Sequence, residues 1–179
     1  MSDIMLDIET LGTDTKSVML SIGACEFDQN RVVGHFERHI DITDSIRAGG
    51  KIDGRTILWW LGQSKEAQQA LLDAKCVSLE SALLDLSAAF DWEGKNVWCN
   101  GASFDFAILK SNFDFINKSL PWAYYSEMDM RTVKGILGKV KWRQIAVAPE
   151  LAHSALSDAI AQAKSLQRVD MLWERKQAA

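Results

Sequence analysis

Two carboxylates interrupt an apolar segment near the N-terminus. Asp7 and Glu9 lie two residues apart in IMLDIETLGT, which otherwise has the apolar and β-branched composition of a buried strand. Residues i and i+2 of a strand point to the same face, roughly 7 Å apart. Two such carboxylates are costly to bury unless a divalent cation binds them, and hard cations such as Mg²⁺ prefer carboxylate oxygens. Solvated acids at an exposed strand end explain this pair, taken alone, equally well.

A third acid, Asp105, follows a short apolar segment and a turn. The sequence NVWCNGASFDFAIL predicts a strand that ends near Asn100, a tight turn at Gly101 and a helix with Asp105 in its first turn. An acid at that position stabilises the helix dipole, which explains Asp105 without any chemistry. The helix dipole does not explain the NG turn or the phenylalanines on both sides of Asp105.

The segment HSALSDAIAQA contains His153 and, five residues later, Asp158. In one continuous helix these two side chains would point about 140° apart. We therefore expect His153 in the loop before a helix and Asp158 in the first turns of that helix. A rigidly held carboxylate suits a metal ligand, and a mobile imidazole with a pKa near neutrality suits a general base. A loop histidine without a catalytic role is the simpler interpretation of His153 considered alone.

The composition is that of a soluble globular protein. The chain has 179 residues, of which 47% are hydrophobic and 25% charged, and we predict a single domain over residues 1–179. Its net charge of −4 argues against a basic nucleic-acid coat, so any nucleic-acid contact must be local or must involve bound cations. Neither a signal peptide nor a membrane-spanning segment is recognisable, and the three cysteines form no CxxC pair. We therefore expect reduced thiols in a cytoplasmic protein that does not bind membranes.

The elements that must position the acids are strands followed by alternating helices and strands. Three strands are expected first, at residues 4–9, 18–27 and 31–40, and the last two form an antiparallel hairpin. A loop at 43–53 precedes helices at 53–63, at 64–74 with Ser64 as N-cap, and at 78–90. Short strands at 96–101 and near Tyr124 then alternate with helices at 103–113, 131–137 and about 154–175. This order predicts an α/β fold in which helices flank a mixed sheet.

Taken together, the acidic motifs resemble those of the DEDD exonucleases, in their histidine-containing branch (DEDDh). Its three exonuclease motifs match LDIETLGT, NGASFDFAIL and HSALSDA, so the resemblance extends from residue 4 to about residue 165. Within that superfamily the chain looks most like small stand-alone bacterial or phage 3′–5′ exonucleases, including the exoribonuclease-like group. The resemblance implies an RNase H-like fold with a mixed five-stranded sheet flanked by helices.

The resemblance also implies a role for each signature residue. Two divalent cations, Mg²⁺ or Mn²⁺, would bind to Asp7, Glu9, Asp105 and Asp158. The two ions would lie about 3.5–4 Å apart and hold the scissile phosphate between them. His153 would take the proton of the attacking water. The product would be a 5′-mononucleotide released from the 3′ end.

Contacts to the terminal nucleotide are implied more loosely. The resemblance places Thr10 and Leu11 against that nucleotide, with Leu11 as a wedge beside the base. The residues of the second motif that would line the same pocket are Asn100, Ser103 and Phe104. Trp59 and Trp60 lie in a segment that approaches the nucleotide in such folds, and aromatic rings stack on any base. Core packing is the alternative for both, although adjacent tryptophans of a helix cannot share one face.

Three further features have simpler interpretations. His35, Glu37 and His39 alternate along one strand face, where an exposed hairpin explains them better than a metal site. Asp129 begins a helix and is expected to be its N-cap. The segment GKVKWR, residues 138–143, places three cations beside Trp142. It is a candidate phosphate-contact strip, but a charged surface loop is the simpler interpretation.

The leading hypothesis is a metal-dependent 3′–5′ exonuclease acting on single-stranded or short 3′ ends. An RNase H-type endonuclease, a non-catalytic module that binds nucleic-acid ends, and a polymerase-associated proofreading subunit are the alternatives. The sequence leaves RNA and DNA open as substrates, because that choice depends on contacts to the 2′-OH. The resemblance is also compatible with a homodimer.

Overall fold

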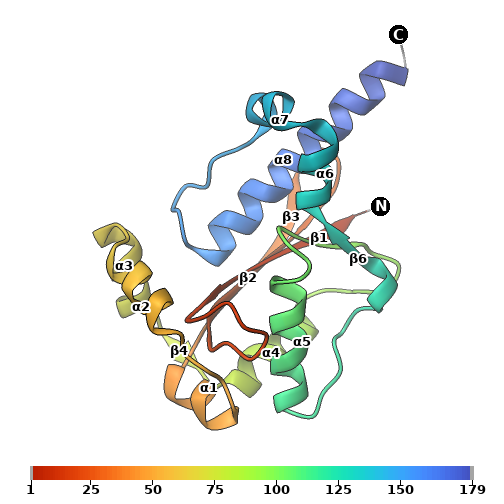
Figure 1. The fold of residues 1–179 in the computed structure, drawn as a ribbon. Helices are drawn as coiled ribbons and strands as arrows, with labels where there is room; N and C mark the ends of the chain where they lie inside the picture. Colours follow the sequence, from red (N-terminus) through yellow and green to blue (C-terminus); the bar gives the residue numbers. More distant parts are fainter. Residues whose placement is uncertain (1, 178–179) are drawn as a thin grey trace.

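A six-stranded mixed sheet forms the centre of the molecule. The computed structural model describes the backbone of residues 2–177 and the side chains of residues 2–169. The antiparallel strands β1 (Asp3–Thr10), β2 (Met19–Phe27) and β3 (Val32–Ile40) form the longest part of the sheet. β5 (Val97–Cys99) runs parallel to β1, β6 (Glu127–Asp129) runs parallel to β5, and β4 (Cys76–Val77) runs parallel to β3. The spatial order is β4-β3-β2-β1-β5-β6 (Figure 1).

The sheet has one strand more than the five predicted. β4 is the additional strand, and its two residues are too few to show an alternating pattern in the sequence. The strand expected near Tyr124 begins three residues later, at Glu127, because Tyr124–Ser126 forms a turn of 3₁₀ helix.

Eight helices are described. Most begin at side-chain caps: Ser64 accepts a hydrogen bond from the Ala67 amide, and Asp129 accepts one from the Arg131 amide, as predicted for both residues. The helices are α1 (Ile42–Ala48), α2 (Gly54–Leu61), α3 (Lys65–Asp73), α4 (Leu79–Ala89), α5 (Asp105–Phe115), α6 (Met130–Leu137), α7 (Lys139–Ile145) and α8 (Ala155–Gln177).

Two segments predicted as loops are short helices. The loop expected at 43–53 contains α1, which is capped by Asp41 and ends at Gly49, where φ is 121°. The Asp44 carboxylate also accepts a hydrogen bond of 2.7 Å from the Leu79 amide, so a distant contact holds α1 against α4. The interpretation of 138–143 as a loop is likewise wrong, because α7 begins at Lys139 and covers all of that segment except Gly138. Seven residues are too few for either helix to show a clear apolar period.

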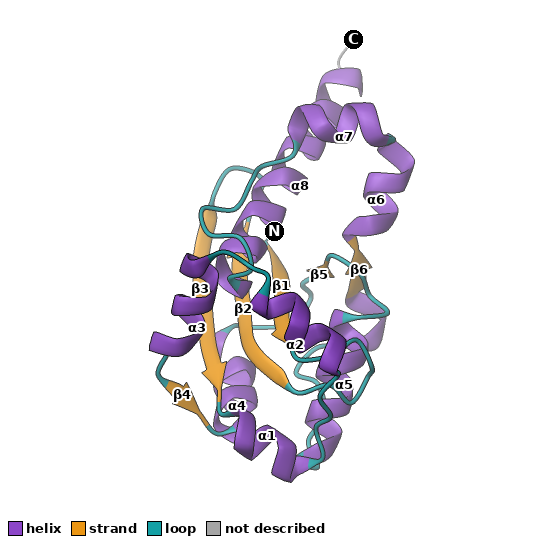
Figure 2. Ribbon diagram, turned by 60° about the vertical axis from the view of Figure 1, so that its left-hand side comes forward, coloured by secondary structure: helices purple, strands orange, loops and turns teal. Residues whose placement is uncertain are grey.

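The two faces of the sheet carry different layers. Ile4, Leu6 and Ile8 of β1 pack in the large core, with α4 and α5. Met5, the alternate residue, packs in a second cluster with Ala159 and Ala163 of α8. Figure 2 shows α8 crossing one face of the long strands and α4 and α5 lying on the other. Because side chains alternate along a strand, Asp7 and Glu9 share the α8 face with Met5.

Candidate active site

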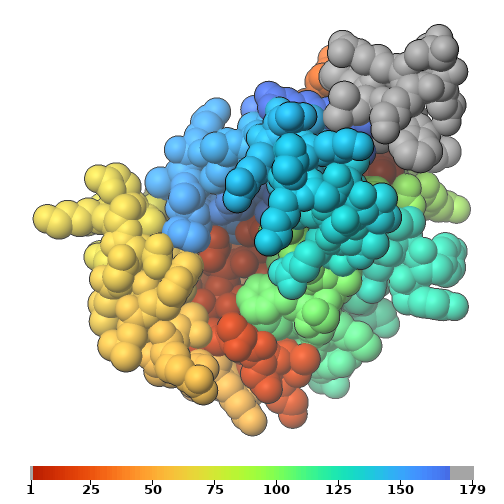
Figure 3. All heavy atoms as spheres, turned by 45° about the horizontal axis from the view of Figure 1, so that its top comes forward, coloured from red at the N-terminus to blue at the C-terminus, as the bar shows by residue number. Residues whose placement is uncertain are grey.

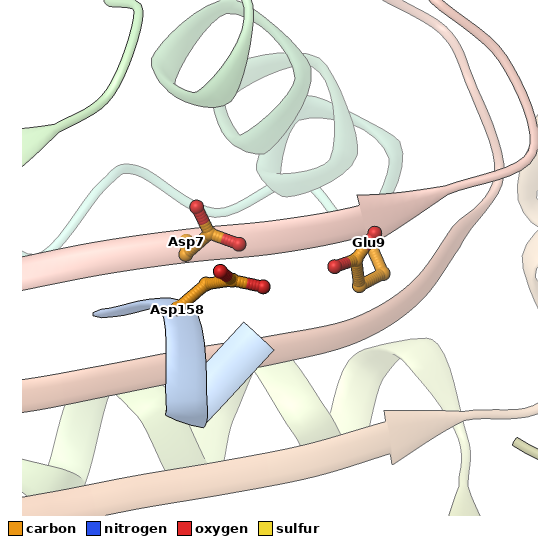
Figure 4. Close-up of side chains that lie close together, drawn as sticks. All are labelled: Asp7, Glu9 and Asp158. Atoms are coloured by element: carbon orange, nitrogen blue, oxygen red, sulfur yellow. The ribbon is translucent and has the colours of Figure 1, made fainter. Parts of the chain in front are cut away.

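Three carboxylates from two elements converge on the α8 face of β1. Oxygen atoms of Asp7, Glu9 and Asp158 all lie within 4.8 Å of one another. Figure 4 shows Asp7 and Glu9 side by side on the strand, with Asp158 reaching toward them from the start of α8. The i, i+2 spacing of the strand and the first turn of a helix thus produce one compact acidic group, an arrangement that the resemblance to the DEDD exonucleases implied.

Gly23 permits this convergence, and the sequence patterns did not reveal it. It pairs with Asp7 across the β1–β2 ladder, directly beneath the first turn of α8. A Cβ atom at this position would overlap the backbone of Ala155 and Leu156. Only a glycine therefore lets the α8 backbone rest on the sheet, and this close approach carries Asp158 to Asp7. The one visible signal was a glycine inside a strand, which often marks close backbone approach.

His153 lies in the turn before α8, as expected. Its backbone has φ of 62°, and its N–H donates a hydrogen bond of 3.0 Å to Asp158 Oδ2. Its imidazole forms T-shaped contacts with two tryptophan rings. The imidazole centroid lies 4.8 Å from that of Trp59 and 6.1 Å from that of Trp60. The backbone of His153 therefore orients Asp158, while α2 supports its side chain.

Asp105 approaches the cluster from the opposite side of β1. It is buried at the first position of α5, immediately after the Gly101 turn. Its carboxylate accepts hydrogen bonds from the Ile8 amide and from the thiol of Cys99. Asp105 is outside the group of three, yet its charge contributes to the raised pKa values of Asp7 and Glu9.

Burial and mutual repulsion make this site hold protons strongly. Burial, followed by the charges of Asp105 and Glu9, raises the pKa of Asp7 well above its usual range. Burial and the charges of Asp158 and Asp105 raise the pKa of Glu9 to about 8. Burial raises the pKa of Asp105 to about 7 and also raises that of Asp158. Protein groups alone leave the charged forms of these acids unfavourable.

The donor set fits a hard divalent cation. All four groups are carboxylates, the ligands that Mg²⁺ and Mn²⁺ prefer. Among the described residues, no lysine or arginine forms a salt bridge with any of the four. A cation would remove both the repulsion and the desolvation penalty that raise their pKa values. The acidic cluster is therefore consistent with a metal site.

A glutamine of α8 completes the surroundings of Asp7. Gln162 lies one helical turn after Asp158, and its Nε2 donates a hydrogen bond of 2.7 Å to Asp7 Oδ1. This hydrogen bond opposes the raised pKa of Asp7. The sequence patterns did not single out Gln162, because 155 residues separate it from its partner.

A pocket of about 490 Å³ opens beside Glu9. Of the residues predicted to contact the nucleotide, it brings together Thr10, Trp59 and Phe104. It adds residues that sequence reasoning missed, among them Asp53, Arg55 and Thr13. Trp59 is 46% exposed and Trp60 only 6%, so one tryptophan faces solvent and the other the core.

Other predicted contact residues lie elsewhere. Leu11 is buried against Val18, Leu20 and Trp60 rather than beside Glu9. Ser103 is exposed and is not among the residues that line this pocket.

Asn100 is held by two cations of α6. Its Oδ1 accepts a hydrogen bond of 2.6 Å from Lys134 Nζ, and its carbonyl oxygen accepts one of 3.0 Å from Arg131. Burial and the nearby Arg131 lower the pKa of Lys134, while Asp129 and Asp7 act in the opposite direction. Lys134 therefore lies within electrostatic reach of the acidic cluster.

Figure 3 shows where the site opens to the surface. Residues of the first strand, in red, form the floor of a hollow, with α2 and α3 in yellow on one side. The blue segment before α8 and the cyan helices α6 and α7 border it on other sides. Residues of the first strand are therefore visible from the surface on this side of the molecule.

The histidines of β3 and the cysteines lie outside the acidic cluster. Within the described residues, His35, Glu37 and His39 do not join a metal-binding group, and His39 Nε2 lies 3.8 Å from a Glu37 oxygen. All three cysteines are free thiols, with Cys25 and Cys99 buried and Cys76 exposed. In the part of the chain that the structure describes, no helix combines the length and hydropathy needed to cross a bilayer.

The fold and the acidic site define the class of protein. The structure resembles E. coli exonuclease I in a complex with single-stranded DNA, with a TM-score of 0.71 and 15% identity over 97% of this chain and 41% of that chain. It also resembles exonuclease X in complex with 5′-overhanging duplex DNA, with a TM-score of 0.62 and 14% identity over 94% of this chain and 91% of that chain. At these identities the likeness shows the fold, which is the RNase H-like fold of DEDD exonucleases.

The family follows from the sequence. Residues 2–169 match the 3′–5′ exoribonuclease Rv2179c-like domain, and the chain belongs to this family of 3′–5′ exonucleases. A curated relative, the exodeoxyribonuclease of Enterobacteria phage T4, is 31% identical over 124 residues. The match covers 61% of this chain and 54% of the phage protein, so the chain spans about half the length of the curated relative.

Proposed function

We propose that this chain is a metal-dependent 3′–5′ exonuclease that releases 5′-mononucleotides from single-stranded or short nucleic acid. The observation that carries the proposal is the convergence of the Asp7, Glu9 and Asp158 carboxylates within 4.8 Å, with Asp105 close by. Membership of the exonuclease family supports the assignment of this acidic cluster to phosphodiester hydrolysis.

The four acids would hold two divalent cations, Mg²⁺ or Mn²⁺. When bound, such cations activate water and stabilise the charge on the leaving 3′-oxygen. The chain itself holds the carboxylates in place: Gln162 donates to Asp7, the His153 amide donates to Asp158, and the Ile8 amide donates to Asp105.

His153 is the proposed general base, which would accept the proton of the attacking water. Its position in the turn before α8 and its T-shaped contacts with Trp59 and Trp60 support this role by holding the imidazole next to the acidic cluster. Asp158 interacts electrostatically with His153 and would stabilise the imidazolium that forms.

The pocket beside Glu9 is the proposed site of the 3′-terminal nucleotide. Trp59 and Phe104 supply aromatic surfaces there, and stacking on them would accept any base. The family is described as exoribonucleases and the phage relative as an exodeoxyribonuclease, so both RNA and DNA are candidate substrates.

The first experiment uses matched single-stranded RNA and DNA carrying a 5′ label. Each is incubated with the protein in Mg²⁺, in Mn²⁺ and in EDTA, and the products are resolved by length over time. A metal-dependent ladder that shortens from the 3′ end is the expected result, and the faster polymer names the preferred substrate. Asp7→Asn is the control, because it removes a proposed ligand while keeping an acceptor for Gln162.

The outcomes separate the alternatives. Internal cleavage without a ladder would indicate an endonuclease. Binding without cleavage in any metal, by protein shown to be folded, would indicate a nucleic-acid-end binding module.

A further inference from the structure

The segment containing α6 and α7 has a charge that differs from the rest of the chain. The whole chain has 24 acidic and 20 basic residues, but no acid occurs between Asp129 and Glu150. Five cations lie in that interval, and we call them the cationic segment: Arg131, Lys134, Lys139, Lys141 and Arg143. A local concentration of positive charge on an acidic protein is a candidate binding surface for an anionic partner.

Three of these cations, Lys139, Lys141 and Arg143, lie on α7, while Arg131 and Lys134 of α6 also hydrogen-bond Asn100. Lys134 is half-buried and the other four side chains are exposed. None of the five forms a salt bridge within the described part of the chain. Elsewhere on the surface arginines do form salt bridges, as in the Arg38–Asp85 pair, whose N–O distance is 2.8 Å. Among the described residues, the three cations of α7 therefore carry charge that no salt bridge neutralises.

Lys134 connects the cationic segment to the active site, because Asp7 acts electrostatically on it. Lys134 bonds Asn100 at the end of β5, and its Nζ lies 5.0 Å from the centroid of the Trp142 ring. Trp142 packs against the cluster that includes Met5 of β1. The tryptophan thus helps to hold α7 against α6 and α8, and α6 and α7 border the hollow in Figure 3.

The helical repeat distributes the charges of α7 around Trp142. With 3.6 residues per turn, Lys139 and Arg143 lie on one flank of the tryptophan and Lys141 lies on the other. Charge therefore covers both sides of the exposed surface of α7 and continues through Arg131 and Lys134 of α6 toward the acids.

We propose that the cationic segment binds the phosphate backbone of the nucleic-acid strand that leads away from the active site. This inference rests on the proposed function, because it assumes that a 3′ end occupies the acidic cluster. The acidic cluster can bind a phosphate only through bound metal cations. The lysines and arginines of the cationic segment can bind phosphates directly. The partner is a single strand long enough to extend from the acids to α7. An oligonucleotide can make this contact, whereas a dinucleotide is too short.

Binding is measured without cleavage, in EDTA, by the fluorescence anisotropy of labelled single-stranded RNA and DNA. Oligomers of about 20 nucleotides are compared with trinucleotides, at salt concentrations from about 50 to 200 mM. The test variant is Lys139→Gln/Lys141→Gln/Arg143→Gln. The control variant is Arg47→Gln/Lys75→Gln/Lys118→Gln, which removes the same number of exposed charges outside this segment.

The test variant is expected to bind the longer oligomer about tenfold more weakly. Each phosphate contact to a single strand contributes about 0.7 to the slope of log K against log salt concentration. The slope of the test variant, which lacks three charges, should therefore be smaller in magnitude by about 2 than that of wild type. The loss should be smaller for the trinucleotide, which is too short to reach α7. The control variant should keep the wild-type slope.

Several outcomes would overturn the inference. These are wild-type protein that shows no salt-dependent binding, a test variant with unchanged affinity and slope, and an equal loss in the control variant. Polyglutamate that binds the segment in place of the oligomers would assign it to an acidic protein partner instead. The proposed function is judged separately, by nucleotide release from the same oligomers in Mg²⁺. Failure of release with charge-dependent binding intact would reject the exonuclease and not the binding surface.

Discussion

Gln162 of α8 donates a hydrogen bond of 2.7 Å from its side-chain amide to Oδ1 of Asp7 on β1. Asp158 lies one turn earlier on the same helix, so α8 supplies both an acid and the group that orients a second acid. The direction of the Gln162 amide follows from its partner, since a carboxylate only accepts hydrogen bonds when it is ionised. The carbonyl oxygen of Gln162 is buried and has no hydrogen-bond partner among the described residues.

Replacing Gln162 should weaken metal binding. Partners that orient a metal ligand typically contribute 10–100-fold in affinity, so we expect Gln162→Met to bind Mn²⁺ roughly tenfold more weakly. Electron paramagnetic resonance of free Mn²⁺ measures this without any nucleic acid. Gln167→Met is the matched control, because Gln167 is buried in the same helix but donates to the Asp28 carbonyl, at 2.7 Å. Equal affinities in wild type and Gln162→Met would show that the hydrogen bond does not position Asp7.

Gly23→Ala should displace the N-terminus of α8. The added methyl group would overlap the backbone of Ala155 and Leu156, so Asp158 must move away from Asp7. Overpacking of this kind lowers the free energy of unfolding by about 1–3 kcal/mol, which urea denaturation measures. Mn²⁺ affinity and cleavage should fall as well.

Gly34→Ala is the control for this substitution. A Cβ at Gly34 meets only ordinary contacts, 3.8 Å from Phe90 Cε1 and 3.9 Å from Glu26 Cβ. If Gly23→Ala retained wild-type metal affinity, close packing of α8 on β2 would not be what brings the acids together.

The stability of the metal-free protein should fall as the pH rises. The pKa of Glu9 is raised from 4.5 to about 8, so between these values the folded protein keeps a proton that the unfolded chain has lost. Stability from protonated Glu9 is fully present below about pH 4.5 and is lost as the pH rises through about 8. The raised pKa values of Asp7, Asp105 and Asp158 act in the same direction.

Urea denaturation in EDTA between about pH 5 and pH 8 tests this dependence. Glu9→Gln should show a smaller decrease, and saturating Mg²⁺ should also reduce it, because a bound cation favours the ionised carboxylates. The carboxyls of Glu26, Asp28 and Asp129, whose pKa values are lowered, oppose the trend only at more acidic pH. A metal-free protein that became more stable toward pH 8 would contradict the electrostatic description of the site.

Removing the His153 side chain should slow catalysis far more than it weakens metal binding. The Asp158 carboxylate accepts its hydrogen bond from the backbone N–H of His153, which alanine retains. Loss of a general base lowers kcat by about 10²–10⁴-fold. Mn²⁺ affinity of His153→Ala should therefore stay near that of wild type while single-turnover cleavage slows. Cleavage at the full wild-type rate would exclude His153 as the base.

Much of the site was determined by local sequence alone. The spacing of Asp7 and Glu9 on a strand, the turn before Asp105 and the loop position of His153 before Asp158 all follow from the periods of strands and helices. The caps Ser64 and Asp129 are equally local, because each side chain satisfies a backbone amide two or three residues away. The short elements β4, α1 and α7 were not predicted. β4 has two residues and each of the two helices has seven, which is too few to show a hydrophobic period.

What only the tertiary structure decided are the contacts between segments far apart in the chain. Asp7 meets Gln162 across 155 residues, and Asn100 meets Lys134 across 34. Gly23 has no local role that distinguishes it from other strand glycines until α8 lies on it. The sequence by itself determined that Asp7 and Glu9 share one face of β1, because side chains alternate along a strand. Packing decided which distant residues reach them, since backbone contact at Gly23 sets the position of the whole helix.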